Sequence, residues 1–82
     1  MIVTMAPVTG KVKGNIKRAR YEMERALNFR GKVTSAKADG NLIELTIEVT
    51  RDWDLPEPEK IAYLKQWIPA RVKQFFKVES VK

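Results

Sequence analysis

Apolar residues recur every three or four positions between residues 12 and 29, and this spacing predicts an amphipathic helix. Its apolar side comprises Val12, Ile16, Ala19, Met23, Ala26 and Leu27. The opposite side comprises Lys17, Arg18, Tyr21, Arg25 and Asn28. Gly14 and Asn15 mark the expected start, with Asn15 as the N-cap. One face of this helix would therefore pack on a core, and the other would present basic groups around a single aromatic ring.

Residues 31–50 alternate between apolar and polar positions and predict two antiparallel strands joined by a turn that contains Asp39 and Gly40. A two-residue loop at these positions would pair apolar with polar side chains. A three-residue loop, with Asn41 added in the left-handed conformation, keeps the two classes apart and opposes opposite charges. The longer loop is therefore our prediction, and the pairs that follow from it are Val33 with Ile47, Lys32 with Glu48 and Thr34 with Thr46.

Two further strands and a second helix complete the pattern. Residues 1–6 are apolar and β-branched and predict a strand that Pro7 ends. Residues 51–58 form a polar connection in which Asp54 and Glu57 have the spacing of a capping box. The helix that follows is interrupted by Pro69, which would kink or divide it. Its apolar face comprises Ile61, Leu64, Ile68, Val72 and Phe75, with Trp67 at the edge. Residues 76–82 predict a last strand.

The resulting order is strand, helix, strand, strand, helix, strand, which is the split βαβ or ferredoxin-like arrangement (βαββαβ) of the α+β class. We expect residues 1–82 to form a single domain, with two helices on one face of a four-stranded antiparallel sheet. The predicted core comprises Ile16, Met23, Leu27, Ile47, Leu64, Ile68 and Val72. The open face of the sheet would carry Lys32, Thr34, Glu44, Thr46 and Glu48.

Charge is concentrated in one segment. Residues 10–32 contain eight of the sixteen Lys and Arg residues and two of the ten acids, so this segment alone accounts for the net charge of +6. Lys17, Arg18 and Arg20 would lie near the positive end of the helix dipole, where a bound anion would offset their repulsion. Lys and Arg are also good helix formers on a solvated face. A pI near 9.8 favours acidic partners, among which nucleic acid is the commonest.

Composition excludes several classes of site. The chain has no cysteine and no histidine, so disulfides, zinc sites and Ser-His-Asp catalysis are excluded, and we expect no metal and no cofactor. No apolar run approaches the length of a membrane span, which is about 18 residues. The first residues lack the features of a secretory signal. We therefore expect the protein in the cytoplasm or in a particle assembled within a cell.

An RNA-recognition motif has the same topology but stacks bases on aromatic residues of its open sheet face. Here that face would carry Thr, Glu and Lys, and residues 41–50 lack the motif's signature. Nucleic-acid contacts would therefore come from the helical side or the loops. Tyr21 could stack on a base or pack along neighbouring Arg stems. Trp53 and Trp67 are expected in the core or at its edge.

Residues 10–18 have the sequence GKVKGNIKR, which resembles the G-x-V-Q-G-x-x-F-R signature of acylphosphatases. These are small ferredoxin-like enzymes that hydrolyse acyl phosphates. The resemblance continues at residues 31–33 and 39–40, in the helix around residues 64–68, and at residues 69–72. It implies a phosphate-binding loop after the first strand, with Arg18 as the ligand of the phosphoryl group. Lys13, Lys17 and Ser35 stand where the family has Gln, Phe and the Asn that orients water, so the catalytic Asn is not matched.

Three functions follow from these patterns. The first is a non-catalytic module that binds the phosphates of DNA or RNA, or another polyanion, through the helix at residues 11–30. Its candidate residues are Lys11, Lys13, Lys17, Arg18, Arg20, Tyr21 and Arg25. The second is an acylphosphatase-like hydrolase with an anion site at Arg18. The third is a structural subunit, a homo-oligomer or part of a virus particle, that would meet partner chains through the last strand, Leu42 or Trp53.

Overall fold

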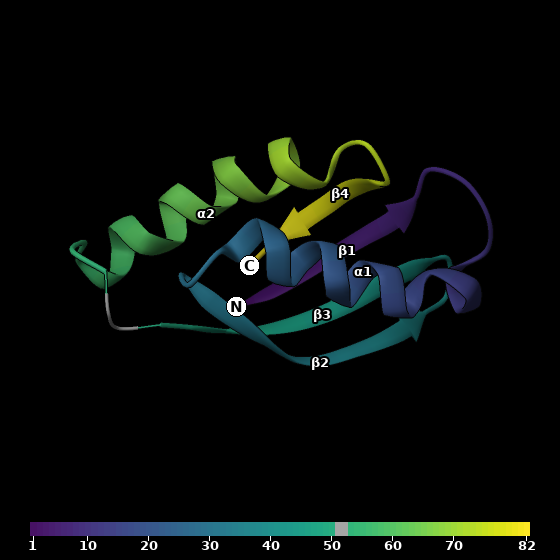
Figure 1. The fold of residues 1–82 in the computed structure, drawn as a ribbon, viewed down its shortest axis with the longest axis horizontal. Coiled ribbons are helices and arrows are strands. Elements are labelled where there is room, and N and C mark those ends of the chain that lie inside the picture. Colours follow the sequence, from purple (N-terminus) through teal and green to yellow (C-terminus); the bar gives the residue numbers. More distant parts are fainter. Residues whose placement is uncertain (51–52) are drawn as a thin grey trace.

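A computed structural model describes residues 1–50 and 53–82, so the predicted connection over residues 51–58 lies partly outside the described residues. Its elements are β1 (Ile2–Pro7), α1 (Val12–Leu27), β2 (Gly31–Asp39), β3 (Leu42–Val49), α2 (Glu57–Val72) and β4 (Phe76–Val81). The four strands form one antiparallel sheet in the order β2-β3-β1-β4, and both helices cover the same face (Figure 1). The predicted α+β fold with ferredoxin-like βαββαβ order is therefore confirmed.

The β2–β3 hairpin has the predicted register at its open end. The confirmed pairs are Lys32 with Glu48 and Val33 with Ile47. A bulge between Val33 and Ser35 then shifts the pairing by one residue, so Ser35, and not Thr34, lies opposite Thr46. The predicted Thr34–Thr46 pair was therefore wrong, although the Thr34 hydroxyl still donates a hydrogen bond to the main-chain oxygen of Thr46 (3.2 Å).

The hairpin loop is shorter than predicted. It contains two residues, Gly40 and Asn41, because Asp39 and Leu42 still pair with each other. Gly40 has a φ of 60°, whereas Asn41 is not in the left-handed region that we expected for it. Glycine at the first loop position adopts a positive φ without strain, as in type II′ turns. The one-residue bulge compensates for the shorter loop, which is why the two errors cancel at the open end.

The core lies between the sheet and the two helices. Alternate residues of the strands, including Val3, Met5, Ile43, Leu45 and Ile47, are buried. They meet the apolar sides of α1 and α2, from which Met23, Leu27, Leu64, Ile68 and Val72 are buried. Ile16 is partly buried and packs against this core, so it is the one predicted core residue that is not fully enclosed. The described strands contain one aromatic residue, Phe76, and it is buried, so the outer sheet face offers no ring.

The starts of both helices differ from the predictions. The N-cap of α1 is Lys11, and Asn15 lies inside the helix, where its side-chain amide donates to the main-chain oxygens of Thr9 (3.2 Å) and Lys11 (2.7 Å). Asn15 therefore connects the preceding loop to α1 by hydrogen bonds but is not the N-cap of the helix. The N-cap of α2 is Pro56, without a side-chain hydrogen bond, so the capping box from Asp54 does not form.

The second helix continues through Pro69 as one element and ends at Val72, before Phe75. Pro58 lies in its first turn, where free N–H groups make a proline harmless. Neither helix in the described part of the chain combines the length and the apolar character that a membrane span requires.

Candidate nucleic-acid interface

Three lysines near the start of α1 form the least compensated charge among the candidate residues. Lys11, Lys13 and Lys17 are exposed, and none of them forms an ion pair with any described residue. The first turn of α1 contains no acidic residue, and the Lys11 side chain makes no capping hydrogen bond. The positive end of the helix dipole therefore adds to the field of the three ammonium groups. An anion at this end would be attracted by both.

Two of the candidate arginines already contact neighbouring side chains. The guanidinium of Arg18 lies over the ring of Phe75, 4.8 Å from its centroid. Arg25 forms an ion pair with Glu22 (3.5 Å) and lies 5.8 Å from the centroid of the Tyr21 ring. A guanidinium over a ring keeps its N–H groups directed outward in its own plane. Arg18 and Arg25 therefore keep donors for an external phosphate.

Arg20 has a structural role that the sequence did not indicate. Its guanidinium donates a hydrogen bond to the main-chain oxygen of Val33 (3.1 Å), beside the bulge in β2. The bulge disturbs the hydrogen bonding between β2 and β3 at this point, and Arg20 of α1 donates a hydrogen bond to the Val33 oxygen there. Of the seven candidates, Arg20 is therefore the one tied to the sheet. Tyr21 presents an open ring, since 62 % of the residue is exposed.

Sequence reasoning missed a cluster of aromatic rings around Arg30. The ring of Tyr63 stacks on Trp67 and meets Trp53 edge to face, with 5.5 Å between centroids in both pairs. The guanidinium of Arg30 lies over all three rings, 5.2 Å from the centroids of Tyr63 and Trp67 and 5.8 Å from that of Trp53. A second cation, Arg71, lies 3.9 Å from the Trp67 ring centroid. The sequence could have indicated part of this cluster, because the four-residue spacing of Tyr63 and Trp67 places both rings on one face of a helix.

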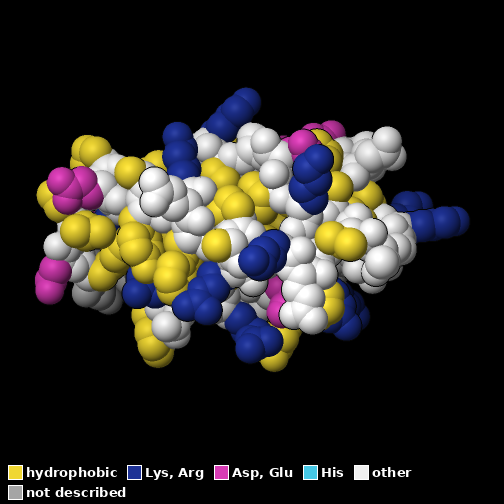
Figure 2. Space-filling model, turned by 90° about the horizontal axis from the view of Figure 1, so that it is seen from above, with side chains coloured by type: hydrophobic (Ala, Val, Ile, Leu, Met, Phe, Trp, Pro, Cys, Tyr) yellow, Lys and Arg dark blue, Asp and Glu magenta, His cyan; other side chains and the backbone are white. Residues whose placement is uncertain are grey.

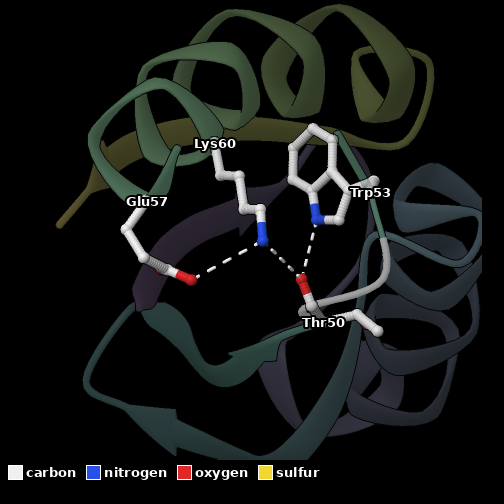
Figure 3. Close-up of polar contacts among 4 residues, drawn as sticks. All are labelled: Thr50, Trp53, Glu57 and Lys60. Carbon is white, nitrogen blue, oxygen red and sulfur yellow. Dashed lines mark hydrogen bonds and ion pairs between the residues drawn. The ribbon is translucent and has the colours of Figure 1, made fainter. Parts of the chain in front are cut away.

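A buried lysine closes the end of this aromatic cluster. Lys60 is only 4 % exposed. Its ammonium group lies 3.4 Å from the main-chain oxygen of Thr50, 3.6 Å from the Glu57 carboxylate and 5.7 Å from the Trp53 ring centroid (Figure 3). The Trp53 indole donates to the same Thr50 oxygen (2.8 Å). The Thr50 carbonyl group thus links the end of β3 to the start of α2. Trp53 and Trp67 pack against the edge of the core, as predicted.

Phe29 is the most exposed large apolar residue, at 88 %. It follows Asn28, the left-handed C-cap of α1, and has a φ of 76°. A bulky side chain at positive φ costs on the order of 1–3 kcal/mol, which glycine at the same position avoids. Leu42 and Trp53 are partly buried, whereas the hypothesis of a structural subunit required them to be exposed.

The residues that resemble the acylphosphatase signature are divided between a loop and a helix. Gly10, with a φ of 83°, and Lys11 lie in the loop after β1, whereas Gly14 and Arg18 already belong to α1. Ser35 lies on β2 opposite Thr46, whose neighbours Leu45 and Ile47 are buried, so alternation places Thr46 on the sheet face away from the helices.

The view in Figure 2 shows hydrophobic side chains gathered over the N-terminal end of α2, with Lys and Arg side chains beside them. Further Lys and Arg side chains extend toward the opposite end of the molecule.

The described residues contain no group of three His, Cys, Asp or Glu side chains that could hold a metal ion. No protein family model, curated protein or solved structure matches this chain.

Proposed function

We propose that the protein binds nucleic acid through its phosphate groups, with little sequence preference, along the exposed side of α1. The observation that carries this proposal is the set of three exposed lysines, Lys11, Lys13 and Lys17, without ion-pair partners in the described part of the chain. Cations that are not neutralised within the protein are free to replace the counterions of a polyanion. We further propose that this binding takes place in the cytoplasm or in a particle assembled within a cell.

The arginines would add to this electrostatic footprint. Arg18 and Arg25 are both exposed, and their contacts with Phe75 and Glu22 orient them without enclosing them. Arg20 contributes charge but remains bonded to Val33. Three to five phosphate contacts follow, and on duplex DNA they give a slope of log K against log salt of roughly −3 to −4.5.

The test is a fluorescence anisotropy titration of labelled duplex DNA at several salt concentrations. Lys13→Ala and Lys17→Ala should each flatten the slope by about one unit and weaken binding to all sequences alike. Lys77→Ala is the matched control, because it removes the same charge from β4, where Lys77 lies 4.0 Å from Glu79. Absence of binding by the wild-type protein at micromolar concentration in about 50 mM salt would contradict the proposal. Equal effects of all three variants would show that net charge alone, and not the face of α1, causes the binding.

A further inference from the structure

Phe29 combines two unfavourable features, a left-handed backbone and an exposed aromatic ring. Its backbone is in the left-handed region (φ 76°), where glycine is favoured, and its side chain is 88 % exposed. A hydrophobic residue after a left-handed helix end often packs back on the helix, but the exposed Phe29 does not do so. Strained residues that persist without a structural reason are concentrated at binding sites. The ring is therefore best explained by a contact outside the chain.

The surroundings of Phe29 indicate the chemistry of that contact. An open hollow of about 470 Å³ lies beside it, lined by Asn28, Phe29, Arg30, Thr50 and Trp53. It thus contains two aromatic residues, a guanidinium, and an amide with both donor and acceptor groups. None of these lining residues carries a carboxylate. A flat ligand with hydrogen-bonding edges and an attached negative charge matches this set.

We infer that Phe29 is a stacking platform for an unpaired base, so that the protein prefers single-stranded nucleic acid. This inference rests on the proposed function, because the phosphates of the same strand would be held by α1 and Arg30. Bases stack on exposed aromatic rings with little regard to sequence, whereas the paired bases of a duplex are not available. Tyr21, which is 62 % exposed beside Arg25, offers a second ring, on α1 itself.

The experiment compares wild type, Phe29→Gly, Phe29→Leu and Phe29→Trp in anisotropy titrations. The probes are an oligothymidylate of about 12 nucleotides, within the range of known single-strand site sizes, and a duplex of the same length. Phe29→Gly should weaken binding to the single strand by about 5- to 100-fold, since one base–ring stack contributes that much. It should leave the duplex affinity and the salt slope unchanged, because no charge is removed.

The other variants separate stacking from apolar contact and from loss of fold. Phe29→Leu keeps an apolar side chain without a ring and should behave like Phe29→Gly, whereas Phe29→Trp should bind as well as wild type. Glycine suits the backbone here, so the melting temperature of Phe29→Gly should not fall.

Wild-type affinity of Phe29→Gly for the oligothymidylate, with the salt slope intact, would overturn this inference and leave the proposed function standing. Absence of any wild-type binding to either probe would overturn both.

Discussion

The indole nitrogen of Trp67 donates a hydrogen bond to the main-chain oxygen of Ala26 at 2.5 Å. The last carbonyl groups of a helix have no partner within the helix, and here α2 supplies one for α1. Trp67→Phe keeps most of the ring but leaves this acceptor unpaired, so we expect the free energy of unfolding to fall by about 1–3 kcal/mol. Urea denaturation of wild type and variant measures this difference in the free energy of unfolding. Tyr63→Phe, which removes a hydroxyl that makes no hydrogen bond within the described residues, should change it by less than about 0.5 kcal/mol.

Gly14 and Gly31 should respond to alanine in opposite directions. Gly14 lies in the first turn of α1, and beyond the backbone of that helix no described atom lies within 4 Å of an added Cβ, so Gly14→Ala should stabilise the protein by about 0.5–1 kcal/mol. A Cβ on Gly31 would lie 3.0 Å from the main-chain oxygen of Glu48 and 3.1 Å from Ile47. Because the neighbouring strand cannot easily move, Gly31→Ala should cost about 1–3 kcal/mol. Thermal melts of both variants check this pair, and equal shifts would count against the close approach of β2 to β3.

Arg20 and Lys17 lie one turn apart on α1, but within the described residues only Arg20 of the two makes a hydrogen bond to the sheet. Arg20→Met removes the hydrogen bond to Val33 and should destabilise the fold by about 0.5–1.5 kcal/mol. Lys17→Met removes an exposed charge without an ion-pair partner in the described chain and should change stability by less than about 0.5 kcal/mol. Chemical denaturation distinguishes the two. A Lys17 variant as unstable as the Arg20 variant would mean that the hydrogen bond to Val33 does not account for the loss of stability.

Leu64 is fully enclosed between the two helices and the sheet. Leu64→Ala would leave a cavity in this core, and the expected loss is about 2–5 kcal/mol. Lys65→Ala, at the next and exposed position of α2, is the control. A loss below about 0.5 kcal/mol for Leu64→Ala in denaturant melts would be incompatible with the apolar face assigned to α2.

Periodicity predicted the fold because it depends only on which residues are apolar. The alternation of Ile43, Leu45 and Ile47 assigned one face of β3, and that face is buried. The bulge at Thr34 and the loop length were not predictable in this way, since one extra residue in the strand and one fewer in the loop leave the same register at Val33. The backbone here also makes a tertiary contact, the hydrogen bond from Arg20 to Val33, which the strand pattern does not contain.

For the candidate interface on α1, the sequence predicted the positive charge but not the contacts that the individual side chains make. Lys11, Lys13 and Lys17 are exposed, as the basic segment at residues 10–32 suggested. The arginines could not be separated by sequence, because their partners Phe75 and Val33 come from distant elements. Phe29 carried a signal that went unused. An Asn-Phe pair stands directly after a helix, where Asn-Gly would fit the backbone better.

The pairing of β1 with β4 has a consequence for how the chain reaches this fold. The hydroxyls of Thr4 and Ser80 lie 2.6 Å apart although 76 positions separate them in sequence. The sheet cannot be completed until almost the whole chain has closed into one loop, which costs conformational entropy before the contact contributes. Contacts of such long range slow folding relative to helical bundles of similar size. If β1 pairs with β3 first, its other edge stays unpaired until β4 docks, and aggregation through that edge then competes with docking.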